Sequence, residues 1–578
     1  MVSATGLLKA LLVSLLLAAS AYGVSKLNLF GLENTSDRLA DQVYQRITAG
    51  DYGADRVGQR AVRVVYLDET SIEAMKGYGW TRFPPTYEQQ WTMFDDLMNV
   101  GGAPPAAMFV DFVYMGQGGS TDGFDTLVSG VAAATKAQAW ADKPGCVADP
   151  LMKIACIVAA GGVPIVFAKP SPAEIEVFTD VQRRLDAVTV LAPALVGQQA
   201  YPLVTRYTFD ATTAAARGVH GFDISPAMAM YAAYCVRRAD GCGLAPFRQL
   251  ARRAKAALAG EPEQAPAVDA VFDAPLDVVW GSRPDPDYLA LTKAVTGRAA
   301  PCRKAADTWR ERLMEQAAGL RGPAAGPMQE CPYAVNIGYD RLVSGQGLEA
   351  KDLETLLAGK IVLVGGHFRA SNDWVESPVH GQVPGVHYHA MALDNLIEHG
   401  AEYRRNANRM LDSDLLKSLM IFALAFCGVL GVMTRNSLLD RAVEEGVEPR
   451  LRAAVYGPLY LALFAVSIGV VVVATWFGVT YAHRSPINWI GLTSVALGFL
   501  FYATRQTLPA DISGSIEKIR LVRQIMAAWR RWRMALRFEE DRLVPPKRPT
   551  PPNTPPASSP NPPSDAKRAQ EAPVHAQA

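Results

Sequence analysis

Acidic residues at or just beyond the ends of apolar runs are the first candidates for chemistry in this sequence. Asp68 and Ser71 follow one run, Asp111 ends another, and Asp373 lies a few residues after a third. In parallel α/β sheets, ligands bind beyond the carboxyl ends of the strands, so we expect these side chains to line one cleft. In the alternative, Asp68 and Ser71 cap a helix and Asp111 anchors a turn. The spacing alone leaves both interpretations open.

Histidines gather in one stretch and raise the question of a metal site. Four of the eight histidines fall there: His367, His380, His387 and His389. If His387 and His389 lie in an extended segment, both project from one face and can share a metal, with Asp373 nearby. The alternative places His389 at the start of a helix and the others on loops. We expect no metal and no other cofactor, and keep His367, His387 and His389 as weak metal candidates.

The sequence lacks the usual signatures of a catalytic site. Gly365-Gly366 follows an apolar run. The chain has neither of the two glycine-rich phosphate loops, G-x-G-x-x-G and G-x-x-x-x-G-K-[ST], and no G-x-S-x-G nucleophile elbow. We therefore expect no enzymatic activity. An exported metal-dependent hydrolase that uses the stretch 367–389 is the weakest of three functional hypotheses.

Strand-like runs predict the scaffold that must position these side chains. They are short, apolar and without alternation, which is typical of strands buried on both faces of a parallel sheet. After the first run, Tyr87, Trp91 and Phe94 recur at helical spacing, and Gly101-Gly102 ends the pattern. This order predicts an α/β domain with a mainly parallel sheet and helical insertions. The predicted strands are Val62–Leu67, Ala106–Val110, Pro164–Ala168 and Lys360–Val364.

Long uncharged stretches predict four membrane-spanning helices, because about 20 helical residues cross a bilayer core. The first, residues 8–25, competes with a cleaved signal peptide, since Ala19-Ser20-Ala21 forms an A-x-A triplet. Residues 504–578 hold 13 Lys or Arg against 7 Asp or Glu, which predicts cytoplasmic termini. The domain at residues 26–411 should then lie outside a bacterial-type inner membrane. The other predicted spans are 415–433, 455–479 and 485–504.

Cysteine placement indicates the same compartment. Six of the seven cysteines fall within residues 26–411, and an oxidising compartment permits disulfides there. Sequential pairs would each close a short loop, although the sequence does not determine the pairing and free buried thiols are the alternative. The candidates are Cys146 with Cys156, Cys235 with Cys242, and Cys302 with Cys331.

Several blocks of residues resemble the CHASE2 extracytoplasmic sensor domain. The resemblance spans roughly residues 30 to 400, and its closing part is the most specific. The layout also resembles that family, which has one span before the domain and usually three after it. The blocks are 64–71, 80–84, 108–114, 360–366, Asp373, Pro378 and 384–396.

The resemblance implies a sensor that binds an unidentified envelope or environmental ligand. Members are commonly fused to a histidine kinase, a cyclase, a diguanylate cyclase or a Ser/Thr kinase, yet nothing catalytic follows the last predicted span here. Residues 236–335, rich in Ala, Arg and Pro, look like an insertion. Block 80–84 departs from the family's usual residue order. The candidate ligand-binding residues are Asp68, Ser71, Arg82, Asp111, Asp373 and His389.

Past the last predicted span, two segments differ sharply in composition. In residues 515–543, apolar residues recur every three or four positions between basic ones, which predicts a basic amphipathic helix. This helix is expected to lie on the anionic inner leaflet, to pair with a partner or a second copy, or to act as a plain juxtamembrane segment. Residues 544–578 are rich in proline and predict a disordered tail.

Together these features favour a membrane sensor that passes its signal to a separate partner. The alternative is a structural or scaffolding envelope protein with a ligand-free domain. Because 57 basic residues stand against 56 acidic ones, the composition excludes a generally nucleic-acid-binding surface.

Overall fold

The computed structural model divides the chain into two units, Met1–Phe501 and Tyr502–Ala578. The predicted basic helix at 515–543 and the proline-rich tail lie outside the described residues, as do Arg82, Cys302 and Cys331. Apart from a few isolated positions, the structure describes residues 32–52, 56–80, 83–99, 102–114, 123–170, 180–194, 200–206, 221–261, 268–287, 332–344, 349–368 and 373–405.

A six-stranded sheet forms the centre of the domain, with strand order β4-β3-β2-β8-β1-β7. Every pairing in it is parallel, and β8 lies between β1 and β2. In register, Tyr66 of β1 pairs with Gly365 of β8, and Val110 of β2 pairs with Val364. The strands are β1 (Val62–Leu67), β2 (Ala107–Val110), β3 (Ile165–Lys169), β4 (Val190–Pro193), β7 (Val335–Gly338) and β8 (Ile361–Gly366).

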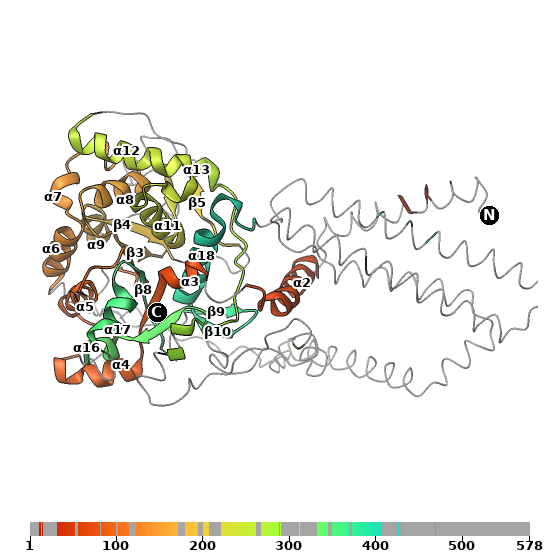
Figure 1. The fold of residues 1–578 in the computed structure, drawn as a ribbon, viewed down its shortest axis with the longest axis horizontal. Coiled ribbons are helices and arrows are strands. Elements are labelled where there is room, and N and C mark those ends of the chain that lie inside the picture. Colours follow the sequence, from red (N-terminus) through yellow and green to blue (C-terminus); the bar gives the residue numbers. More distant parts are fainter. Residues whose placement is uncertain are drawn as a thin grey trace, which may run out of the picture. The chain divides into compact units, whose positions relative to one another are not determined.

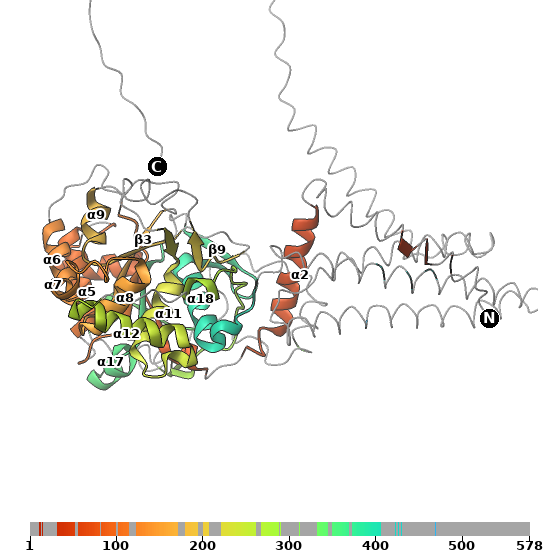
Figure 2. The same ribbon diagram turned by 90° about the horizontal axis from the view of Figure 1, so that it is seen from above.

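Helices cover both faces of this sheet (Figures 1 and 2). The helices of the described residues are α2 (Leu32–Thr48), which stands apart from the sheet, α3 (Val57–Ala61), α4 (Glu69–Ala74), α5 (Tyr87–Asn99), α6 (Phe124–Ala134), α7 (Ala137–Trp140), α8 (Pro150–Ala159), α9 (Asp180–Asp186), α11 (Pro226–Arg237), α12 (Ala245–Ala259), α13 (Val268–Val271), α16 (Tyr339–Ser344), α17 (Ala350–Leu357) and α18 (Gly385–His399). Three 3₁₀ turns are η2 (Met75–Tyr78), η3 (Gly241–Gly243) and η4 (Gly400–Glu402). Two small antiparallel sheets join β5 (Val204–Arg206) to β6 (Phe222–Ile224) and β9 (Trp374–Ser377) to β10 (Gly381–Pro384).

The core consists of one hydrophobic cluster on each face of the sheet. Because successive strand residues point to opposite faces, Val62 and Val64 of β1 join the first cluster, while Val65 and Leu67 join the second. Helices α8, α11 and α18 complete the first cluster, and α5, α6 and α17 complete the second. Figure 1 shows α8, α11 and α12 on one side of the strands and α5, α16 and α17 on the other. Burial on both faces explains why these strands are apolar without alternation.

Local sequence signals mark where several helices begin. Asp149 caps α8 by accepting a hydrogen bond from the Met152 N–H at 2.8 Å, and Pro150 occupies the first turn. Ser225 caps α11 in the same way and is followed by Pro226. A short polar side chain satisfies an otherwise unpaired N–H there, and proline suits the first turn because it has no N–H to satisfy.

The structure confirms the predicted α/β class and the four predicted strands, with shifts of one or two residues at their ends. Helix α5 stands where the Tyr87 pattern predicts it. Strands β4 and β7 were not predicted. They are the two outermost strands of the sheet, and β7 lies next to β1.

Within the described part of the chain, no helix is long and apolar enough to cross a membrane. The predicted spans at 8–25, 415–433, 455–479 and 485–504 lie outside the described residues except for isolated positions.

Candidate functional site

The carboxyl edge of the sheet brings together the residues that follow β1, β2 and β8. The Asp111 N–H donates to the Val364 carbonyl at 2.8 Å, and the His367 N–H donates to the Leu67 carbonyl at 2.7 Å. The parallel ladder therefore continues past the strands and carries Asp68, Asp111 and His367 to one edge. This is the edge at which ligands bind in parallel α/β sheets.

At this edge, Asp68 and Ser71 are engaged in holding the fold together. Asp68 caps α4 by accepting a hydrogen bond from the Ser71 N–H at 2.6 Å. The Ser71 hydroxyl is buried and donates to the Asp340 carboxylate at 2.8 Å, which links α4 to α16 beyond the end of β7. For these two residues the capping interpretation is therefore the one that the structure supports.

Asp111 differs from these two residues, because one oxygen of its carboxyl group lacks a hydrogen bond in the described structure. The side chain is only 7% exposed, and Oδ2 has no hydrogen-bond partner among the residues that the structure describes. Oδ2 lies 4.0 Å from Nε2 of His389. Burial, and after it the neighbouring Asp373 carboxylate, raises the pKa of Asp111 well above its usual range. Asp111 is thus a carboxylic acid that favours its neutral form and has hydrogen-bonding capacity to spare.

His389 is positioned by Tyr201. The Tyr201 hydroxyl lies 2.7 Å from Nδ1 of His389 and accepts a hydrogen bond from the Ala227 N–H at 3.2 Å. Burial lowers the pKa of His389 to about 3, so the ring is neutral and carries one proton. Because a backbone N–H already donates to the Tyr201 oxygen, we assign the tyrosine proton to the bond with Nδ1. That assignment leaves the imidazole N–H on Nε2, facing Asp111.

Asp373 is close enough to Asp111 to raise its pKa. An added Cβ on Gly385 would lie 2.2 Å from Oδ1 of Asp373, so the carboxylate rests against the first residue of α18. The Gly385 N–H also donates to the Asp373 carbonyl at 3.0 Å. Although Asp373 as a residue is exposed, the protein around its carboxyl group desolvates it and raises its pKa to about 6, while a backbone hydrogen bond from Gly385 acts in the opposite direction. Asp111 therefore has two neighbours of interest, the His389 imidazole and the Asp373 carboxylate, and both acids have raised pKa values.

A group of apolar side chains borders the same carboxyl edge of the sheet. Phe83 packs against Phe368 with ring centroids 4.0 Å apart and against Phe112 at 5.6 Å. Phe83 and Val113 are each 41% exposed, which is unusual for such side chains. The predicted ligand residue Arg82, adjacent to Phe83, lies outside the described residues. The arrangement combines a polar pair with aromatic side chains that a ligand could contact.

The helix alternative applies here, because His387 and His389 both lie in the first turns of α18 and not in an extended segment. Two residues apart on a helix are about 200° apart around the axis, so the two rings do not face one metal. Burial lowers the pKa of His387 to about 3, and its ring lines a small cavity with Trp280, Tyr333 and His380.

The third weak candidate, His367, packs its ring edge-on against Tyr66 and Trp374. The described residues contain no group of three His, Cys, Asp or Glu that could hold a metal ion.

Two of the three expected disulfides are present. Cys146 is bonded to Cys156 and Cys235 to Cys242, which confirms these sequential pairs. The third pair, Cys302 and Cys331, lies outside the described residues. Both disulfides support the first cluster, since Cys146, Cys156 and Cys235 are fully buried in it.

Sequence reasoning did not identify several residues that shape this site. Tyr201 belongs to an isolated β-bridge with Leu276 and has no local pattern that marks it. Asp340, the partner of Ser71, follows a strand that the sequence analysis did not predict.

Comparison with known protein families matches residues 283–430 to the CHASE2 domain. The match includes β7, β8 and α18, and with them the closing block of the resemblance. It is narrower than the expected range of about 30 to 400, since β1 to β6 precede it. No catalytic output domain is detected. No curated protein and no solved structure matches the chain.

The matched segment does not form the sheet by itself. Its strands β7 and β8 lie on either side of β1, which precedes the match. The earlier residues therefore complete the same fold. The chain contains a CHASE2 domain, a type of domain that is typically an extracytoplasmic sensor.

Proposed function

We propose that this protein is a membrane-bound sensor whose domain binds a small polar ligand at the edge formed by Asp111, Asp373 and His389. The observation that carries the proposal is the Asp111 carboxyl group, whose Oδ2 is buried and without a hydrogen-bond partner in the described structure. Leaving such a group unsatisfied costs about 1–3 kcal/mol, and a ligand that bonds to it recovers part of that cost.

The chemistry of the three groups suggests the kind of ligand. A neutral carboxylic acid donates one hydrogen bond and accepts others, and the His389 Nε2–H is a donor. Asp373, with its pKa raised to about 6, is ionised at neutral pH and accepts only. A hydroxyl- or amide-bearing small molecule matches this mixed set, and the exposed ring of Phe83 gives its apolar part a surface.

The domain is placed outside the inner membrane in this proposal, between predicted spans 8–25 and 415–433. Two disulfides support an oxidising compartment, and CHASE2 domains are usually extracytoplasmic. Both termini are then cytoplasmic. The signal passes to a separately encoded cytoplasmic partner, or to a second copy of this chain, through the predicted helix 515–543.

A thermal-shift screen of the full chain in detergent tests the ligand site. The library holds sugars, nucleotides, metal ions and envelope-derived metabolites, and a ligand at 100 times its Kd adds about 2.7 kcal/mol of stability. We expect a hit that Asp111→Asn and Asp373→Asn both weaken, and that the matched control Asp142→Asn, at an exposed aspartate, leaves intact. A hit that persists undiminished in both site variants would contradict the site.

A scaffolding role with no ligand is the second candidate. It is favoured by Asp68 and Ser71, which the fold uses for capping and for the bond to Asp340. A screen in which no compound shifts the melting temperature would favour this role over sensing.

A further inference from the structure

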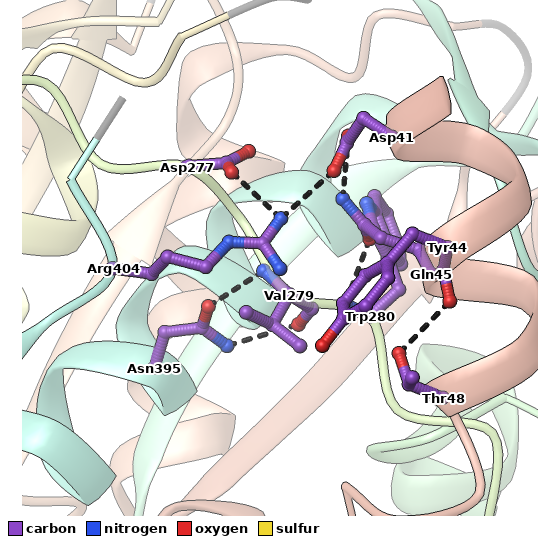
Figure 3. A network of polar contacts seen from close by, with 9 residues as sticks. All are labelled: Asp41, Tyr44, Gln45, Thr48, Asp277, Val279, Trp280, Asn395 and Arg404. Atoms are coloured by element: carbon purple, nitrogen blue, oxygen red, sulfur yellow. Dashed lines mark hydrogen bonds and ion pairs between the residues drawn. The ribbon is translucent and has the colours of Figure 1, made fainter. Parts of the chain in front are cut away.

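A buried ion cluster joins the two ends of the described domain. The Arg404 side chain is only 7% exposed, and its guanidinium donates to Asp41 of α2 at 3.0 Å and pairs with Asp277 at 2.6 Å. Asp41 and Arg404 are 363 residues apart in sequence. Figure 3 shows the guanidinium between the two carboxylates, with Asp41 on α2 and Asp277 on the irregular segment that continues to Val279.

Further hydrogen bonds attach α2 to the same segment. Gln45 donates to the Asp41 carboxylate at 2.8 Å and accepts from the Trp280 N–H at 3.3 Å. Asn395 of α18 accepts from the Val279 N–H at 2.7 Å and donates to the Val279 carbonyl at 3.0 Å. A continuous polar network thus runs from α2 through residues 277–280 to α18 (Figure 3).

The position of this network along the chain indicates which segments it connects. Helix α2 begins shortly after the predicted span 8–25, and Arg404 stands shortly before the predicted span 415–433. The cluster therefore fastens together the two segments that connect the domain to its first two predicted spans. This role of the cluster rests on the predicted spans and not on the proposed ligand site.

The charges of this cluster centre on Arg404. One guanidinium stands against two carboxylates, so its removal would leave the buried Asp277 and the partly buried Asp41 without a cation. Breaking a buried ion pair by removing one partner is strongly destabilising, because the remaining charge has no compensation. Loss of Arg404 should consequently loosen α2, although the Trp280 N–H still donates to Gln45.

We propose that Arg404 is a clamp that holds α2 and residues 403–405 as one body, so that a movement of the domain reaches the first two spans together. A ligand could then alter both spans by shifting a single rigid element, provided that it binds the two arrangements with different affinity. The clamp is a positioning device and makes no contact with the proposed ligand site.

Hydrogen exchange of the full chain in detergent micelles, read by mass spectrometry, tests the clamp. In Arg404→Gln we expect exchange in residues 39–52 to rise at least about tenfold while β1, β2 and β8 keep their protection. The matched control is Arg405→Gln, since Arg405 is half-exposed and lies over the Tyr403 ring at 5.5 Å. It should leave the exchange of α2 unchanged.

Two results would overturn the proposal. One is unchanged exchange of α2 in Arg404→Gln, and the other is an equal rise across α2 and the strands, which would show global destabilisation. If Arg404→Gln does not fold, Asp41→Ala gives the same readout, because Arg404 keeps its bond to Asp277. Neither readout requires a ligand, so failure of the clamp and failure of the ligand site are seen separately.

Discussion

Replacing Asp394 by asparagine should make the protein more stable at alkaline pH. Asp394 is a buried residue of α18 that accepts a hydrogen bond from the Tyr52 hydroxyl. Gly58 of α3 packs so closely that an added Cβ would lie 2.4 Å from Oδ1 of Asp394, which leaves no room for water there. Burial, assisted by Glu398, raises the pKa of Asp394 to about 7, although the bond from Tyr52 lowers it.

The sign and size of the effect follow from linkage between protonation and folding. An acid whose pKa is higher in the folded state stabilises the fold below its unfolded pKa of about 4, and this contribution is lost as pH rises through about 7. A shift of about 3 units at about 1.4 kcal/mol each sets an upper limit of about 4 kcal/mol. Asparagine keeps an oxygen for Tyr52 but cannot ionise, so it removes this loss.

Denaturant unfolding of the full chain in detergent, followed by tryptophan fluorescence between about pH 5 and pH 8, measures the effect. We expect the wild type to lose stability toward high pH, and Asp394→Asn to lose much less and to exceed the wild type at about pH 8. Asp142→Asn, at an exposed position, is the control and should follow the wild type. A variant that loses stability as steeply as the wild type would refute the argument.

Three further predictions concern the candidate site and the disulfides. Asp111→Asn should change the free energy of unfolding by less than about 1 kcal/mol near neutral pH, because the raised pKa already favours the neutral acid; denaturant titration checks it, and a loss of several kcal/mol would indicate an ionised Asp111. Asp68→Ala should cost about 1 kcal/mol of stability through loss of the α4 cap, seen as a lower unfolding midpoint. Ser71→Thr keeps a hydroxyl and tests whether the hydrogen bond to Asp340 tolerates an added methyl group. The Cys146→Ser and Cys156→Ser pair should lower stability by roughly 3 kcal/mol, the value expected for so short a closed loop; an unchanged midpoint would show that the disulfide is not formed in the purified protein.

The sheet could be predicted from the sequence because its signals are local. Val62–Leu67 and Ile361–Gly366 are almost wholly buried, so composition alone marks them as central strands. Their order could not be predicted. Nothing near residue 361 indicates that β8 inserts between β1 and β2, because that position is decided by packing across some 300 residues of chain.

The candidate site was predictable in its location but not in the roles of its members. The carboxyl-edge rule brings Asp68 and Asp111 to one edge, and the structure does so. Only the atoms around each carboxylate show that Asp68 is engaged as a helix cap while Oδ2 of Asp111 is left without a partner in the described residues. This difference between Asp68 and Asp111 depends on residues that are distant in the sequence, such as Tyr201 and His389.

The Arg404 cluster could not be predicted from the sequence for the same reason. Asp41, Asp277 and Arg404 come from three distant parts of the chain, and each is an ordinary charged residue in its local sequence. A charged side chain is normally taken as solvated, so burial of this arginine is information that only the fold supplies.

In the proposed sensor, events at the sheet edge reach the predicted spans through α2. The direct measurement is hydrogen exchange of the full chain with and without a ligand identified in the thermal-shift screen. We expect the ligand to change exchange in residues 39–52 and 403–405 of the wild type, and to leave α2 unaffected in Arg404→Gln while still protecting the ends of β2 and β8. Protection confined to the sheet edge in the wild type would contradict the claim.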